Sequence, residues 1–397
     1  MNNSISIVTQ NKCFSCRSCF LSCPKNAIEM IENEEGFFYP KVDETKCVNC
    51  GICIKKCPSV KIPDNGNFQQ EVFAAYCKNP EQLLKSASGA ASSVFASHII
   101  KENGVVFGVT YDSDLFVHHV SCRSEDELDK IKGSKYVESF TGDTYIEAKE
   151  YLEEGKKVLY TGSPCQIAGL KKYLGKEYEN LFTVDLICHG VPSRKLFRKY
   201  LDWLGHKNKG KIIYYGFRDK DVGGWSCGGK AKTKTKTKTK TIEGSCDPYY
   251  SSFLKCETFR ESCYSCPFAN SRRISDITIG DFWGIEKYYP EIKKQNGVSC
   301  ILINSTKGKE LFDSVNEEFE YTNCKIEEVQ DANTNLRQPA PRGKFRDEVY
   351  KEIDGDIREY FKKFKYPSII KVRGRVLISK LIPKSVKKLL KKIMRIG

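Results

Sequence analysis

Strand and helix patterns alternate along most of the chain. Short apolar runs, typical of buried strands, occur as GVVFGV at 104–109, VLYT at 158–161 and LFTVDLIC at 181–188. Apolar residues at helical spacing predict helices in YIEAKEYLEEG at 145–155 and in QIAGLKKYL at 166–174. Because strands and helices alternate, we expect an α/β domain with a mainly parallel sheet.

Three segments depart from this pattern. KIPDNGNFQQEV at 61–72 is polar and contains Pro and Gly, as linkers do. KAKTKTKTKTKT at 230–241 alternates Lys with β-branched Thr, which predicts an exposed strand or hairpin arm with Lys facing water. At 369–397, apolar residues recur at helical spacing with Lys on the other face. Such a helix suits an anionic membrane surface, an acidic partner or its own domain.

The net charge of +15 is concentrated in one segment. Residues 360–397 hold thirteen Lys and Arg and no acidic residue, so residues 1–359 are almost neutral. The overall charge is therefore no reason to expect nucleic-acid binding.

The sequence contains nineteen cysteines. MNNSISIVTQNK has neither the basic nor the apolar region of a signal peptide, and no apolar run approaches the ~18 residues of a membrane span. We therefore expect a cytoplasmic protein, at most peripheral at the inner face of the membrane. In that reducing compartment, clustered thiols indicate metal or redox chemistry.

The run C-x2-C-x2-C-x3-C-P occurs twice before residue 60. Its members are Cys13, Cys16, Cys19 and Cys23 in the first copy, and Cys47, Cys50, Cys53 and Cys57 in the second. The repeat resembles a bacterial two-cluster ferredoxin and predicts an α+β ferredoxin-like domain with two 4Fe–4S clusters. Three thiolates on a tight loop can cap three irons of a cubane, while the fourth points away. We therefore expect Cys57 to complete the first cluster and Cys23 the second. Zinc ribbons are the alternative, but they do not need four cysteines per run.

A second set of cysteines follows the predicted strands. Cys165 and Cys188 each follow an apolar strand, and neighbouring parallel strands would bring both to one edge of the sheet. CETFRESCYSCP adds Cys256, Cys263 and Cys266, three ligands that lack a fourth. We expect these three to bind a third 4Fe–4S cluster, with Cys188 as the preferred fourth ligand and Cys165 as the second choice. Zinc, or burial as small apolar side chains, is the alternative.

Several longer segments resemble one protein family. They are ASGAASSVFASHIIKENGVVFGV, GSKYVES, VLYTGSPCQIAGLKKYL, VDLICHGVPS, RESCYSCPFANSRRISDITIGDFWGI and QPAPR. In this order they resemble the coenzyme F420 hydrogenase/dehydrogenase beta-subunit family. The resemblance implies a ferredoxin domain at 1–62, the family's N-terminal segment at 74–152, its C-terminal segment at 153–342 and a basic helical tail at 343–397.

The resemblance also implies a function. Members are oxidoreductases that bind FAD and at least one 4Fe–4S cluster, and archaeal members pass electrons to the deazaflavin coenzyme F420. Partners would be a redox protein and a small-molecule hydride acceptor. A flavin would join them, because it exchanges single electrons with clusters and hydride with organic acceptors. The alternative is an electron-transfer subunit that feeds a separate reductase or polysaccharide-modifying enzyme and has no substrate site of its own.

Candidate flavin-binding residues follow from the resemblance, because no G-x-G-x-x-G follows a predicted strand. They are Ser88, Gly89, Ser134, Lys135, Tyr136, Gly162 and Pro164. Cys165 and His189 are the candidate catalytic residues, and His189 would donate a proton near the flavin or cap a turn. Where the family usually has a second glycine, this chain has Ala90, which restricts close approach of a ring or phosphate.

Overall fold

The computed structural model describes residues 3–225, 228–234, 240–243, 247–292, 296–357 and 359. The predicted helix at 369–397 lies outside these residues. Within the described ranges, no helix combines the length and apolar character needed to cross a membrane.

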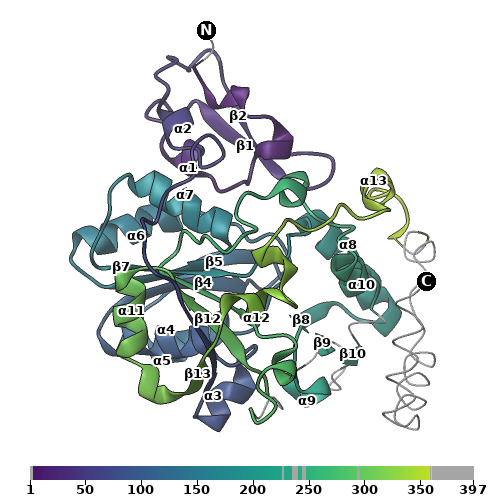
Figure 1. Cartoon of the computed structure of the whole chain (residues 1–397). Coiled ribbons are helices and arrows are strands. Elements are labelled where there is room, and N and C mark those ends of the chain that lie inside the picture. The colour runs from purple at the N-terminus through teal and green to yellow at the C-terminus, as the bar shows by residue number, and fades with distance from the viewer. Residues whose placement is uncertain are drawn as a thin grey trace, which may run out of the picture.

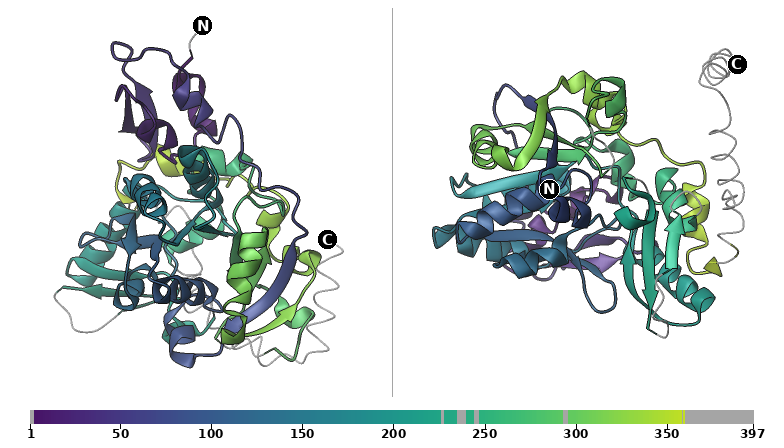
Figure 2. Two further views of the ribbon diagram at one scale, coloured as in Figure 1. Left: turned by 90° about the vertical axis from the view of Figure 1, so that its left-hand side faces the viewer. Right: turned by 90° about the horizontal axis from the view of Figure 1, so that it is seen from below.

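A small N-terminal unit projects from one end of a larger body (Figures 1 and 2). It contains the antiparallel strands β1 (Ile28–Glu32) and β2 (Phe38–Val42) and the short helices α1 (Ser18–Leu21) and α2 (Ile52–Lys55). Both helices begin after a left-handed residue, Arg17 at φ 64° and Gly51 at φ 74°. The two cysteine runs thus fold alike, as their repeated spacing predicts.

The larger body is built on an eight-stranded sheet in the order β13-β3-β12-β11-β7-β6-β4-β5. Its strands are β3 (Glu71–Cys77), β4 (Val105–Tyr111), β5 (Val117–Cys122), β6 (Val158–Gly162), β7 (Leu181–Leu186), β11 (Ile277–Asp281), β12 (Ser299–Ile303) and β13 (Phe319–Asn323). The four central strands β4, β6, β7 and β11 run parallel, and the others pair antiparallel. The predicted parallel sheet is therefore confirmed at the centre, but the sheet as a whole is mixed.

Helices cover both faces of this sheet. They are α3 (Pro80–Lys85), α4 (Ala91–Lys101), α5 (Glu125–Ile131), α6 (Thr144–Glu153), α7 (Pro164–Leu174) and α11 (Thr306–Asp313). Val106 of β4 packs in the core with α4, α5 and α11, whereas its neighbours Val105 and Phe107 pack in the core with α6 and α7. This alternation follows from the two-residue period of a strand, and it explains why the central strands are apolar throughout.

A smaller antiparallel sheet lies beside the large one (Figure 1). It contains β8 (Ile212–Gly216), β9 (Gly228–Thr233) and β10 (Lys240–Glu243), and the helices that follow the large sheet are α8 (Arg194–Asn208), α9 (Lys220–Gly223), α10 (Pro248–Leu254), α12 (Ile326–Gln330) and α13 (Arg346–Lys351). In the Lys/Thr run, Lys232 and Lys234 are exposed and Thr233 is buried, as the alternation predicts.

Candidate functional site

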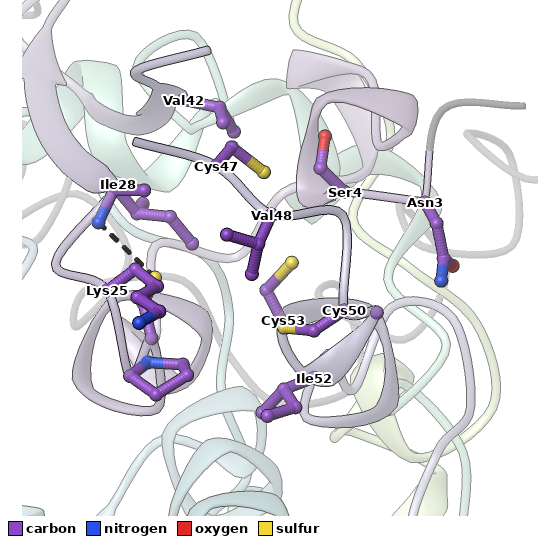
Figure 3. A pocket seen from close by; sticks show the side chains of 14 residues that line it. Asn3, Ser4, Lys25, Ile28, Val42, Cys47, Val48, Cys50, Ile52 and Cys53 are labelled. Atoms are coloured by element: carbon purple, nitrogen blue, oxygen red, sulfur yellow. Dashed lines mark hydrogen bonds between the residues drawn. The ribbon is translucent and has the colours of Figure 1, made fainter. Parts of the chain in front are cut away.

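Four cysteines line a cavity near the tip of the N-terminal unit, here called the outer cavity. They are Cys23, Cys47, Cys50 and Cys53. Figure 3 shows the last three, with Val42, Val48 and Ile52, around about 360 Å³ of empty space. The backbone N–H of Ala27 donates to Cys23 Sγ at 3.3 Å. Cys50 is exposed, and Val48 beside it is 58% exposed, so this cavity lies close to solvent.

The other four cysteines of the two runs line a second cavity, the inner cavity. They are Cys13, Cys16, Cys19 and Cys57, with Met30, Pro40 and Pro58 among the apolar lining. Burial raises the pKa of Cys16 and of Cys19, and the negative charges of the neighbouring thiolates raise both further. These are the two groupings that the spacing predicts, with Cys57 and Cys23 exchanged between the runs.

A third group of four thiols lies at the carboxyl edge of the large sheet. Cys165 is in the first turn of α7, directly after β6, and Cys188 follows β7. Because β6 and β7 are parallel neighbours, both cysteines leave the sheet at the same edge, beside Cys263 and Cys266. Burial raises the pKa of Cys165 to about 12, and the charges of Cys188 and Cys266 add to that shift. We call Cys165, Cys188, Cys263 and Cys266 the third thiol group.

Cys256 lies elsewhere, although the sequence analysis placed it in this group. Its Sγ is 3.5 Å from Nε2 of His189, whose Nδ1 is 3.0 Å from Oδ1 of Asn335. The His189 ring packs against Phe253 and Phe259. The physical reason is local: Cys256 follows the end of α10 in a left-handed conformation at φ 58°, which turns the chain before the other two cysteines. The ligand set expected from sequence therefore changes, with Cys165 in place of Cys256.

The inner cavity and the third thiol group meet at α7. An ideal Cβ on Gly169 would lie 2.7 Å from Cβ and 3.1 Å from Sγ of Cys16. Cys165 lies one helical turn earlier, and its charge contributes to the raised pKa of Cys16. Ser262, next to Cys263, donates from Oγ to the carbonyl of Cys13 at 3.0 Å.

The candidate flavin residues are dispersed, and several have internal partners. Ser88 donates from Oγ to the carbonyl of Val298 at 2.9 Å. A Cβ on Gly89 would lie 2.3 Å from the Ala75 carbonyl oxygen, so this glycine serves close packing against β3. Lys135 donates to the carbonyls of residues 131–133, and burial lowers its pKa to about 7.

The remaining candidates have structural partners as well. Gly162 ends β6 and Pro164 opens α7, behind a capping box between Ser163 and Gln166. Tyr136 packs against Phe217, Tyr250 and Phe253, and Ser134 is half-buried in the same loop.

Sequence reasoning missed a pair of cations beside the Ser88 turn. Lys220 donates from Nζ to the Ser88 carbonyl at 2.7 Å, and Arg218 pairs with Asp281 at 2.5 Å. Asp281 also accepts from Nε1 of Trp225 at 2.6 Å, and this indole stacks on Trp283 with ring centroids 4.8 Å apart. Arg218, Lys220 and Trp225 form no sequence motif, so only the fold identifies them.

The described part of the chain contains no group of three or more His, Cys, Asp or Glu side chains placed around a single metal ion. A cubane of four irons and four sulfides is larger than one ion, and its thiolate ligands stand correspondingly further apart.

The comparisons with known proteins match both parts of the chain. Residues 12–60 match the family model for a 4Fe-4S dicluster domain. Residues 155–329 match the family model for the C-terminal part of the coenzyme F420 hydrogenase/dehydrogenase beta subunit. No curated protein matches the chain significantly.

One solved structure with a similar chain is described as xenon derivatization of the F420-reducing [NiFe] hydrogenase complex from Methanosarcina barkeri. It has 16% sequence identity and a TM-score of 0.45, and the match covers 78% of this chain and 97% of that one. On the two family models, this chain belongs to the coenzyme F420 hydrogenase/dehydrogenase beta-subunit family and carries a 4Fe-4S dicluster domain at its amino end.

Proposed function

We propose that the chain is an iron–sulfur flavoprotein oxidoreductase that moves electrons between a redox partner protein and a hydride acceptor. The observation that carries this proposal is the succession of three thiol groups: the outer cavity, the inner cavity and the third thiol group. The last two meet where Cys16 packs on Gly169. We also assign the chain to the cytoplasm and the tail at 360–397 to the inner membrane surface.

The thiol groups fit 4Fe–4S clusters in number and surroundings. Each has four cysteines, and both cavities have largely apolar linings, which favour a buried cluster over free ions. Cys165 stands in the first turn of α7, where the helix N-terminus stabilises a thiolate. Electrons would enter at the exposed outer cavity and pass through the inner cavity to the third thiol group.

We place the flavin beside the cations Arg218 and Lys220. Burial lowers the pKa of Lys220 to about 8, and a bound anion such as a pyrophosphate would keep its ammonium charged. The partly exposed Trp225–Trp283 pair offers a flat apolar surface nearby. When bound, FAD would supply the conversion of single electrons into hydride.

The ligand assignment is tested by iron and sulfide analysis of anaerobically purified protein. We expect about twelve irons per chain, four for each of three clusters. Cys165→Ser should lower the content to about eight, whereas the matched variant Cys256→Ser should leave it unchanged. The reverse result for the two variants would restore the ligand set first expected from sequence.

The flavin assignment is tested by releasing the cofactor with acid and identifying it by fluorescence and chromatography. We expect about one FAD per chain and at least tenfold less after Lys220→Met, because its cation would be lost from the pyrophosphate. Lys78→Met, at an exposed position, is the control. Full retention of FAD in Lys220→Met would place the flavin elsewhere.

A second function has one specific observation in its favour. The side chains of Ser88 and Lys135, expected to bind the flavin, hold internal hydrogen bonds. A protein with twelve irons and no flavin would match an electron-transfer subunit that feeds a separate reductase or polysaccharide-modifying enzyme.

A further inference from the structure

Arg260 is a buried cation beside the segment that carries the third thiol group. Its side chain is 1% exposed. Its backbone N–H donates to the Val191 carbonyl at 3.0 Å, and its own carbonyl accepts from the N–H of Cys263 at 2.9 Å. The main chain of Arg260 is thus fixed between the loops that present Cys188 and Cys263.

The guanidinium reaches into the N-terminal unit. It lies 4.6 Å from the ring centre of Phe37 and 4.7 Å from that of Tyr39, and donates to the Phe38 carbonyl at 3.3 Å. Cys13 of the inner cavity is close enough for the guanidinium charge to lower its pKa, against the larger effect of burial. The same charge lowers the pKa of Cys165, which belongs to the third thiol group. One cation therefore acts on both groups.

The hydrogen bonding of this cation is incomplete. Nη2 donates to Oε1 of Glu138 at 2.5 Å. Among the described residues, Nε of Arg260 and Oε2 of Glu138 are buried without a hydrogen-bond partner. A buried ion pair with unsatisfied atoms contributes little to stability, because desolvation offsets the attraction. A free buried donor next to thiolates is, by contrast, suited to a cluster sulfur, and hydrogen bonds to sulfur raise the potential of iron–sulfur clusters.

The pair presents its positive side to the inner cavity. At Cys13, the charge of Arg260 has a larger effect on the pKa than the opposing charge of Glu138. Reduction adds a negative charge to a cluster, so a nearby cation favours the reduced state, and a low-dielectric interior strengthens that effect.

We propose that Arg260 is a positioning residue that holds the reduction potentials of the inner and third clusters up together, so that electron transfer between them stays close to isoenergetic. In the step concerned, one electron leaves the reduced inner cluster and reduces the oxidised third cluster, without proton transfer or bond cleavage. This inference rests on the proposed function, which supplies the two clusters.

The test is an anaerobic redox titration of the full chain, followed by electron paramagnetic resonance. Signals are assigned by comparison with Cys50→Ser for the outer cluster and Cys165→Ser for the third. We expect Arg260→Gln to lower the potentials of the inner and third clusters by at least 59 mV, a tenfold change in a one-electron equilibrium constant. The outer cluster, which lies beyond the inner one, serves as the internal reference.

Two further variants separate charge from structure. Arg260→Lys keeps the cation and should hold both potentials near their original values. Glu138→Gln removes the counter-charge and should shift the inner potential upward, opposite to Arg260→Gln. If Arg260→Gln does not fold, this upward shift and the Arg260→Lys result carry the test.

Potentials that stay within 59 mV in Arg260→Gln, or a downward shift in Glu138→Gln, would overturn the inference. Failure of the proposed function looks different. A content of about eight irons that Cys165→Ser does not lower would remove the third cluster, while the inner cluster would still report on Arg260.

Discussion

His119 is a buried histidine in a chain of hydrogen bonds that ends at the third thiol group. Its Nε2 lies 3.3 Å from the Thr161 carbonyl, which can only accept, so Nε2 carries the proton and Nδ1 accepts from Oγ of Ser139. Ser139 also accepts from Gln166, whose side chain caps α7 beside Cys165. Burial lowers the pKa of His119 to about 4, so the ring is neutral at pH 7.

This pKa predicts a loss of stability in acid. Between pH 6.5 and pH 4 the unfolded chain binds a proton at His119 and the folded chain does not, so the free energy of unfolding falls as the pH falls. From pH 7 to pH 5 the contribution amounts to about 2 kcal/mol. Anaerobic urea unfolding of the original protein and of His119→Gln should show this difference in pH dependence. Parallel pH profiles for the two proteins would contradict it.

At the residue scale, sequence predicted the ligands well where spacing was regular. The two runs indicated all eight cysteines of both cavities and their exchange, because a short loop fixes three thiols relative to one another. The choice between Cys165 and Cys256 could not be made in the same way. It depends on which strands are neighbours and on the left-handed turn at Cys256, and neither has a local sequence signal.

Among the elements, α7 is the one that connects the two parts of the protein. Its first turn carries Cys165, and Gly169 in its middle is packed against Cys16. Glycine inside a helix costs roughly 0.5–1 kcal/mol relative to alanine, so its presence here indicates a close contact. The sequence shows the helix but not the surface that approaches it.

Gly169→Ala should disturb the inner cavity. The added methyl would need Cys16 to move, and such overpacking costs about 1–3 kcal/mol in spite of the better helix propensity. We expect fewer irons per chain and a lower thermal midpoint. Gly205→Ala in α8 is the matched control, since its Cβ would meet the Gly210 carbonyl at 3.0 Å, away from any thiol group. An equal loss of iron in both variants would argue against a specific contact at Cys16.

Sequence periodicity predicted the central strands and the helices that cover them. The antiparallel outer strands escaped this prediction, because a buried apolar run looks the same in either direction. The direction of β5 is set by the short turn after β4, where the Asp112 carboxylate accepts from the backbone N–H groups of residues 114 and 116.

On the scale of the whole molecule, a bidentate ion pair fastens the N-terminal unit to the larger body. Arg346 of α13 donates from Nη1 and Nη2 to the two carboxylate oxygens of Glu35 at 2.8 and 2.7 Å. Arg346 is 1% exposed and also donates from Nε to the Phe259 carbonyl. The loop between β1 and β2 is therefore held by a helix more than 300 residues later in the sequence.

Glu35→Gln should loosen this attachment. It leaves the Arg346 cation buried without its counter-charge, at a cost of about 3 kcal/mol. We expect faster limited proteolysis of the polar segment at 61–70, which joins the two parts. Glu34→Gln, at the exposed neighbouring position, is the control. Equal cleavage rates in the two variants would show that other contacts hold the unit in place.

The exposure of Cys50 and Val48 at the tip of the N-terminal unit sets an order of vulnerability. Dissolved oxygen or a chelator would reach a cluster in the outer cavity before the one behind it, where three of the four thiols are 8% exposed. Oxidative injury would thus begin at the port farthest from the organic cofactor. A chain that has lost its tip cluster would be cut off from its electron supply while its interior stayed intact, and replacing that single outer cluster would return it to service.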